Sequence, residues 1–314
     1  MISIVRYDPS MAARWDDFVR QSSNGTLLHL RGYMDYHSDR FTDCSLIAFD
    51  SRGRIVGLLP ANADGKTIRS HQGLTYGGWI TGTRHFASDT MLEAWEKMAG
   101  WMRAAGFSEL IYKPIPQIYH RYPADDDLYS LFRLGAQLES CQISSAIPVG
   151  EPWLGNQDAR QKVRNAGRDG TEIRRSSDFP LFMEMLSQRL DEKYGAVPVH
   201  SLAEMELLAG RFPDNIRLIM AYDPSGEPLA GTIIYRMPTV VHTQYIATTE
   251  AGRRQGVFAA VTSHLLENEC NGCRWLDFGT SCEQAGRILN ASLNRQKYGL
   301  GGRPVAHPTL RLPL

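Results

Sequence analysis

The stretch TVVHTQYIATTE at residues 239–250 contains three side chains that can move protons, His242, Tyr245 and Glu250. A histidine, with an ordinary pKa of about 6.5, can take a proton from an attacking ammonium, so His242 is the candidate general base. Its structural alternative is a half-buried histidine bonded across a sheet. Strict strand alternation predicts that His242 and Tyr245 lie on opposite faces. Tyr245 would donate a proton or bind acceptor, or it is a core tyrosine with a tethered hydroxyl. Glu250 is a second candidate base, or it stabilises a helix N-terminus.

The turn GRRQG at residues 252–256 follows this strand and precedes a predicted helix with Val257, Phe258, Val261 and Leu265 on one face. Unpaired backbone N–H groups at a helix start bind phosphate or carbonyl oxygens. The candidate donor-binding residues are therefore those of the turn, with one asparagine from the last predicted helix: Arg253, Arg254, Gln255, Gly256 and Asn290. Helix capping is the structural alternative for Asn290.

Candidate substrate-binding residues come from three other segments. Asp277 ends the predicted buried strand WLDFG, at the edge where ligands gather in open α/β sheets, or it forms a structural salt link. Lys162 and Arg164 belong to the basic segment RQKVRNAGRDGTEIRR, which is either a phosphate clamp or a solvated face. Tyr76 and Trp79, in HQGLTYGGWITG, would form a ledge for a sugar or peptide, or part of a bulged strand.

Composition narrows the function classes. The chain has 314 residues, a formal net charge of zero and five cysteines, and its pI is about 7.1. This balance provides no global field that would attract nucleic acid or an anionic membrane. The odd cysteine number fits reduced thiols, and the single pair Cys270 and Cys273 lacks a second metal-ligating pair, so no metal is expected. No signal segment or membrane span is recognised, and we expect a cytoplasmic protein.

The two halves of the chain show the same order of elements. Each reads as strand, turn, strand, strand, helix, strand, helix, strand, with the boundary near PVGEPWLGNQ at residues 148–157. This order indicates an internal duplication in the α/β (α+β) class, with expected domains 1–150 and 151–314.

The order, with the segments YIATTEAGRRQGVFAAVTSHLLE, WLDFG and NASLNRQKYGLGG, resembles the GNAT acyltransferase superfamily. It is most similar to the tandem-domain branch with the Fem aminoacyltransferases of peptidoglycan cross-bridge synthesis. The resemblance implies two tandem GNAT-like domains, each a mixed, mostly antiparallel sheet flanked by helices. It also implies an N-acyltransferase, with acetyl-CoA, another acyl-CoA or an aminoacyl-tRNA as donor. The acceptor would be an amine on a small molecule, a sugar-nucleotide or a peptidoglycan precursor.

The chain departs from that family pattern at three places. The pyrophosphate turn of members that use acetyl-CoA follows R/Q-x-x-G-x-G/A, where Arg253 and Gly256 match but Phe258 replaces a small residue. The tyrosine that protonates the departing thiolate is missing from residues 293–296. The coiled-coil arm that grips transfer RNA is also missing. Two alternatives therefore stay open, a non-catalytic binding module that has lost its donor site and an armless enzyme that depends on aminoacyl-tRNA.

Overall fold

The computed structural model describes residues 2–83 and 87–314, and the chain divides into two compact units. Unit 1 contains the chain up to Gln142 together with Gln284–Arg287 and Ala306–Leu314, and unit 2 contains Ile143–Glu283 and Ile288–Val305. This division differs from the expected domains 1–150 and 151–314. The last residues belong to unit 1 because the C-terminal strand β17 (Arg303–Pro313) pairs with β8 (Glu109–Tyr112).

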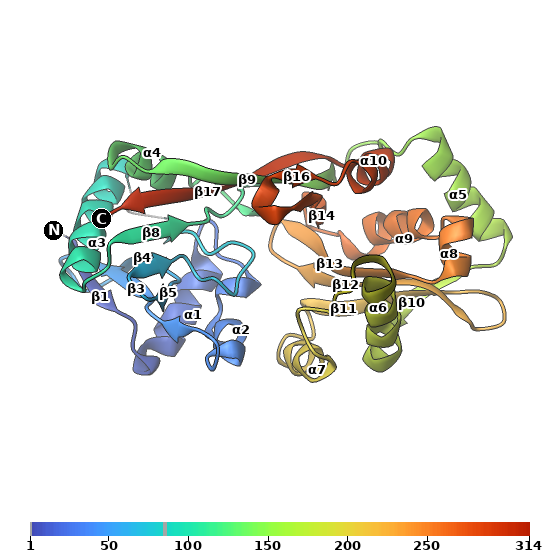
Figure 1. Ribbon diagram of the computed structural model, residues 1–314, viewed down its shortest axis with the longest axis horizontal. Coiled ribbons are helices and arrows are strands. Elements are labelled where there is room, and N and C mark those ends of the chain that lie inside the picture. Colours follow the sequence, from blue (N-terminus) through green and yellow to red (C-terminus); the bar gives the residue numbers. More distant parts are fainter. Residues whose placement is uncertain (1, 84–86) are drawn as a thin grey trace. The chain divides into compact units, whose positions relative to one another are not determined.

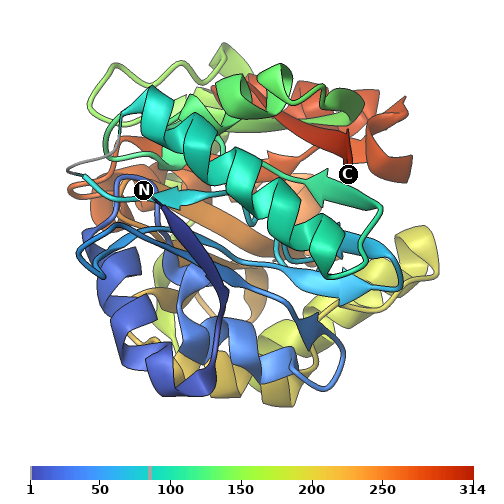
Figure 2. The ribbon, with the colours of Figure 1, turned by 90° about the vertical axis from the view of Figure 1, so that its left-hand side faces the viewer.

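Unit 1 contains two groups of strands and four α-helices among its described residues. Its first sheet has the order β1-β3-β4-β7, and a second group runs β17-β8-β6-β5-β2. The other strands are β1 (Ser3–Arg6), β2 (Thr42–Asp43), β3 (Leu46–Phe49), β4 (Ile55–Leu59), β5 (Asn62–Asp64), β6 (Thr67–Arg69) and β7 (Ile80–Thr81). The α-helices are α1 (Ala12–Gln21), α2 (Arg31–Met34), α3 (Ser88–Ala104) and α4 (Asp126–Arg133). Short 3₁₀ helices are η1 (Pro9–Met11), η2 (Leu27–His29), η3 (Asp35–His37), η4 (Gln117–Tyr119) and η6 (Gln284–Gly286). Figure 2 shows α3 on one side of these strands and α1 and α2 on the other.

Unit 2 is built on strands in the order β10-β11-β12-β13-β14-β9. Its strands are β9 (Gln137–Pro148, which enters unit 2 at Ile143), β10 (Glu172–Ser176), β11 (Ile216–Tyr222), β12 (Pro228–Arg236), β13 (Val240–Thr248), β14 (Trp275–Thr280), β15 (Cys282–Glu283) and β16 (Ile288–Leu289). Its helices are α5 (Gln157–Arg168), α6 (Phe179–Tyr194), α7 (Leu202–Arg211), α8 (Glu250–Gln255), α9 (Phe258–His264), the π-helix η5 (Leu265–Glu269) and α10 (Ala291–Gly299). In Figure 1, α8 and α9 are drawn above these strands and α7 below them.

The two faces of the unit 2 sheet are covered by different helices. On one face, α9 buries the stripe predicted from the sequence, Val257, Phe258, Val261 and Leu265. The other face lies against α6 and α7, because a Cβ at Gly231 of β12 would be 2.9 Å from the ring of Phe182 and Tyr235 contacts Met205. A ligand on this sheet therefore meets α9 on one side and α6 and α7 on the other.

A β-bulge in β13 changes which side chains share a face. Ile234 lies opposite Thr243 but Ile233 lies opposite Tyr245, so Gln244 is the extra residue. The extra residue shifts the alternation by one place. Tyr245 therefore lies on the same face as His242, the face covered by α6 and α7, and the prediction of opposite faces was wrong.

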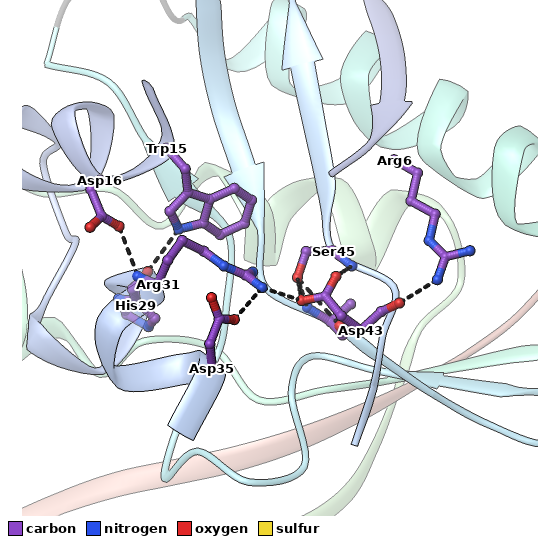
Figure 3. A network of polar contacts seen from close by, with 9 residues as sticks. Arg6, Trp15, Asp16, His29, Arg31, Asp35, Asp43 and Ser45 are labelled. Carbon is purple, nitrogen blue, oxygen red and sulfur yellow. Dashed lines mark hydrogen bonds and ion pairs between the residues drawn. The ribbon is translucent and has the colours of Figure 1, made fainter. Parts of the chain in front are cut away.

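Arg31 holds the first helices of unit 1 against the sheet, as Figure 3 shows. Its guanidinium bridges the carboxylates of Asp35 and Asp43, and lies 3.8 Å from the ring centroid of Tyr7. Its backbone N–H donates to Asp16, 2.7 Å away. The charge is only 6% exposed, and it is tolerated there because two carboxylates and an aromatic face surround it.

Asp127 of α4 is a buried carboxyl in the core of unit 1. It accepts from the hydroxyl of Tyr112, which itself accepts from the backbone N–H of Trp79 at 2.7 Å. Burial raises the pKa of Asp127 from 3.8 to about 7, because the free energy lost by removing the carboxylate from water exceeds the free energy gained from its hydrogen bonds.

This shift predicts a pH dependence of stability. The folded protein keeps the Asp127 proton up to about pH 7, whereas the unfolded chain releases it near its ordinary value of about 4, so stability falls as pH rises between these values and is then level. The measurement is urea unfolding from pH 4 to pH 8. Asp127→Asn should flatten the slope, and Glu96→Gln, an exposed change on α3, should not. An unchanged slope in Asp127→Asn would contradict the assignment.

Candidate active site

Strands β13 and β14 are parallel neighbours that pair over only three residues. The pairs are Val240 with Trp275, Val241 with Leu276 and His242 with Asp277. Beyond them β13 bulges at Gln244, and β14 is irregular in its pairing with β9 between Asp277 and Thr280. We call the point where the regular pairing ends the fork. At such a fork the ladder of backbone hydrogen bonds between the strands is interrupted. Side chains then take the place of the missing backbone partners.

The last pair before the fork is a histidine bonded to a carboxylate. His242 Nδ1 lies 2.9 Å from Asp277 Oδ2, with the two side chains 13% and 1% exposed. Asp277 Oδ1 also accepts from the backbone N–H of Gly279 at 3.1 Å. With Nδ1–H donated to the carboxylate, Nε2 of His242 is the nitrogen that accepts a proton. The buried carboxylate orients the imidazole ring, as a general base requires.

Lys297 of α10 completes the cluster. Its Nζ donates to the carbonyl oxygens of Gly279 at 2.9 Å and Thr280 at 2.6 Å. Burial lowers the pKa of this lysine to about 8, although the charge of Asp277 acts in the opposite direction. A lysine with this pKa is mostly protonated at neutral pH and gives up its proton readily.

Gly279 lies next to both His242 and Lys297. Its φ is +69°, and a Cβ placed on it would be 3.2 Å from Cε1 of His242. Neither Gly279 nor Lys297 was predicted from the sequence to be a site residue. The available signal was a lysine on the last predicted helix, followed directly by the glycine-rich segment YGLGG.

A cavity of about 500 Å³ lies between α5, the turn from α8 to α9, and α10. Its charged lining residues are Asp158 and the cations Lys162, Arg253 and Arg295. Two elements contribute residues to both the cavity and the fork. Strand β13 contributes Thr248 to the cavity and His242 to the fork. Helix α10 contributes Gln296 to the cavity and Lys297 to the fork. The excess of positive charge suits a phosphate-bearing ligand.

The turn at Gly256 was expected to offer unpaired amides, and the structure shows several of them in use. The N–H groups of Gly256, Val257 and Ala259 donate to the carbonyls of Arg253, Gly252 and Gly256 respectively. The stem of Lys162 also crosses the turn, since a Cβ at Gly256 would lie 2.4 Å from Lys162 Cδ. Positive side chains, more than backbone amides, thus face the cavity at this turn.

Phe258 stands where the family pattern of the pyrophosphate turn has a small residue. Its ring packs against Phe278 with centroids 6.4 Å apart, and the residue is 6% exposed. The ring therefore serves as cavity wall and core at once.

Other predicted donor and base residues lie apart from the fork. Glu250 begins α8, beyond the far end of β13 from His242, and forms an exposed ion pair with Arg254 at 3.4 Å. Gln255 is exposed on the same short helix. Asn290 caps α10 by accepting from Leu293 N–H and donates to Glu283. The geometry therefore matches helix capping, which was the structural alternative to donor binding for Asn290.

Two further predicted residues are hydrogen-bonded to other side chains of unit 2. Tyr245 bonds to His200, with 2.6 Å between its hydroxyl and Nδ1. Arg164 donates to Gln161 on the exposed side of α5, outside the residues that line the cavity. Of the basic segment, Lys162 is the residue that reaches the cavity, and it is paired with Asp158 at 2.7 Å.

The predicted ledge of Tyr76 and Trp79 is wrong. Tyr76 is 2% exposed and its ring lies 4.6 Å from that of Tyr119, while Trp79 is 1% exposed and packs near Trp95. A Cβ at Gly57 would be 1.9 Å from the Trp79 ring, so the glycine makes room for the indole in the core. Both rings fill unit 1 instead of forming a surface.

The pair Cys270 and Cys273 is buried, and burial raises the pKa of Cys270 to about 12. These are therefore poorly reactive thiols. Within residues 2–83 and 87–314, His, Cys, Asp and Glu side chains nowhere gather in threes suited to a metal ion. Of the helices described there, none combines the length and apolar character of a membrane crossing.

The close approach at Gly279 predicts a specific effect of Gly279→Ala. Alanine at a positive φ costs roughly 1–2 kcal/mol, and its Cβ would also push on the His242 ring. Gly226→Ala is the matched control, because Gly226 has φ +92° and nothing within 4 Å of an added Cβ. Urea unfolding should show a loss in both variants, and imidazole NMR spectra should change at His242 in Gly279→Ala alone. Unchanged His242 signals there would refute the contact.

Comparison with known proteins relates part of this chain to a known family by sequence, and the whole chain to solved structures by fold. Residues 156–285 match the family model described as "Acetyltransferase (GNAT) domain". A search of curated proteins finds no matching sequence. Among solved structures, FemX has a TM-score of 0.72 at 13% identity, with 99% of this chain and 97% of FemX covered.

Two other solved structures share the fold at similarly low identity. L-PGS from Bacillus licheniformis has a TM-score of 0.62 at 13% identity, covering 98% of this chain and 92% of that one. A tandem GNAT protein from the clavulanic acid biosynthesis pathway has a TM-score of 0.50 at 12% identity, covering 100% and 98%. Residues 156–285 are thus similar in sequence to the GNAT acetyltransferase domain, and the chain as a whole shares the fold of FemX and of the tandem GNAT protein.

Proposed function

We propose that the protein transfers an acyl or aminoacyl group from a phosphate-bearing activated donor to the amine of a cytoplasmic small-molecule or cell-wall-precursor acceptor. The observation that carries this proposal is the cluster of His242, Asp277 and Lys297 at the fork. It combines an oriented proton acceptor with a buried ammonium of lowered pKa. Acyl transfer to an amine needs both, because the nucleophile loses a proton while the leaving group gains one.

In the proposed reaction the acceptor nitrogen attacks the donor carbonyl carbon, and a C–N bond forms as the C–S or C–O bond of the donor breaks. Nε2 of His242 accepts the proton that the nitrogen loses, and Asp277 stabilises the resulting imidazolium. Lys297 gives a proton to the departing thiolate or alkoxide. The products are an amide and the free thiol or alcohol, and a proton returns from His242 to Lys297 through solvent.

The cavity between α5 and α10 is the proposed donor site. Coenzyme A and the 3′ end of a transfer RNA both present phosphates, which the cations Lys162, Arg253 and Arg295 would meet. The internally bonded turn at Gly256 favours side-chain over amide recognition of these phosphates. Acetyl-CoA, a longer acyl-CoA and an aminoacylated adenosine-ended oligonucleotide are the donors to compare.

Calorimetric titration with these three donors and free CoA tests the site. Lys162→Ala should weaken binding of the donor by roughly 10- to 100-fold, as expected for loss of one charge-assisted hydrogen bond of about 1.5–3 kcal/mol. Arg168→Ala is the control, since Arg168 is an exposed cation on the same helix outside the cavity lining. Equal weakening in both variants would show a general charge effect and contradict a specific contact. Silence of wild type toward every donor would favour the non-catalytic binding module.

The lowered pKa of Lys297 predicts how kcat depends on pH on the alkaline side of the pH–rate profile. As pH rises through about 8, Lys297 loses the proton that the leaving group needs, so kcat should fall. Lys297→Met should lower kcat by roughly 10²–10⁴ and remove this limb, and Lys297→Arg should shift the limb to higher pH. The profile needs an acceptor whose amine titrates far from pH 8. A limb at pH 8 that persists in Lys297→Met would exclude the lysine as the acid.

A further inference from the structure

A second cavity of unit 2 lies on the face of the sheet toward which His242 points. It has a volume of about 560 Å³ between α6 and the segment that leads into α7. One wall is a stripe of α6 with the spacing of a single helix face, Pro180, Met183, Glu184 and Ser187. The other wall is the segment 197–204. We call this cavity the α6–α7 groove.

The lip of the groove is apolar and exposed. Val197 and Val199 are 81% and 79% exposed, and Pro198 between them also lines the groove. Proline favours an extended conformation for the residue before it, and in extended chain residues two apart share a side. Single exposed valines are ordinary, but two that border a cavity with Met183 and Leu202 form apolar surface which a ligand would remove from water.

The groove is tied to the strand that carries His242. The hydroxyl of Tyr245 lies 2.6 Å from His200 Nδ1 and accepts from the His200 backbone N–H at 3.2 Å. Burial raises the pKa of Tyr245, so its hydroxyl keeps the proton that it donates to Nδ1. Because the bulge places Tyr245 and His242 on one face, a molecule in the groove lies on the same side of β13 as the proposed base.

The charge of the groove distinguishes possible occupants. The charged side chains of its described lining are the carboxylates of Glu184 and Glu204. Glu204 accepts from the Ser201 N–H at 2.8 Å as part of a helix cap, whereas Glu184 is exposed in the middle of the α6 stripe. An apolar cleft with a carboxylate attracts an alkylammonium and repels a fatty carboxylate.

We propose that the α6–α7 groove binds the aliphatic chain of the amine acceptor, so that the preferred acceptors are primary amines with a linear alkyl segment. This inference rests on the proposed function for the role of the amine, but binding in the groove is measurable without any donor. The alkyl chain of the acceptor lies against Met183, Val197 and Val199. The Glu184 carboxylate favours a cationic acceptor over a neutral or anionic one.

The test is calorimetric titration with butylamine, hexylamine and octylamine below their micelle concentrations, with octanoate and octanol for comparison. Affinity should tighten about fourfold per buried methylene, and octanoate should bind more weakly than octylamine. The double variant Val197→Ser, Val199→Ser should lose most of this dependence on chain length. Leu207→Ser is the matched control, because Leu207 is 44% exposed on α7 outside the groove. All these side chains are exposed, so the variants should keep the wild-type melting temperature.

Charge preference is tested separately. Glu184→Gln should reduce the preference for octylamine over octanol while leaving octanol binding unchanged. Equal affinity for all chain lengths, or a chain-length dependence that survives in the double variant, would overturn the proposal. A Glu184→Gln variant with the full amine preference would overturn the assignment of the carboxylate.

Failure of the groove and failure of the proposed function give different results. If octylamine does not bind but the enzyme acylates short amines in a reaction that needs His242, the groove proposal alone is wrong. If octylamine binds as predicted but no donor supports transfer, the proposed function alone is wrong. When both hold, kcat/KM should rise with chain length in wild type and not in the double variant.

Discussion

The early end of the pairing between β13 and β14 is the constraint on which the candidate site depends. A regular parallel ladder would continue past His242 and Asp277 and leave their side chains as an ordinary cross-strand pair. Instead both strands become irregular within a few residues, and the carbonyls of Gly279 and Thr280 are met by Lys297. Backbone groups inside a protein require partners, so the irregularity itself creates a place for a buried lysine.

The same site balances buried charge by specific contacts. Asp277 is fully buried and receives the His242 ring and the Gly279 N–H, and Lys297 is 5% exposed and donates to two carbonyls. Each group is tolerated because its partners replace water, and removing one partner would leave another buried and unsatisfied. In unit 1 the buried charge of Arg31 is balanced by two carboxylates, both of which contact its Nη2. The proposed chemistry and the stability of this region therefore depend on the same hydrogen bonds at the fork.

Sequence patterns predicted the elements well where the pattern was local. The buried stripe of α9 follows from spacing, because a helix face involves residues only a few places apart. His242 and Asp277 were each selected as candidates, but 35 residues separate them along the chain. Nothing local indicates that one is bonded to the other. Tyr76 and Trp79 show the reverse error, since an aromatic next to glycines looks like a ligand surface until its burial is known.

The amino-acid sequence by itself determined the tandem GNAT-like fold class, the buried stripe of α9 and the residue types able to do acyl-transfer chemistry. Tertiary structure decided which of them meet. One bulged residue, Gln244, places Tyr245 on the face of His242, and the last helix places Lys297 against the carbonyls of β14. Neither contact has a periodic signature, because a bulge changes the alternation without changing composition and a contact between distant segments depends on how the sheet closes. The physical reason is that periodicity reports which side of an element is buried, whereas catalysis depends on which buried sides face each other.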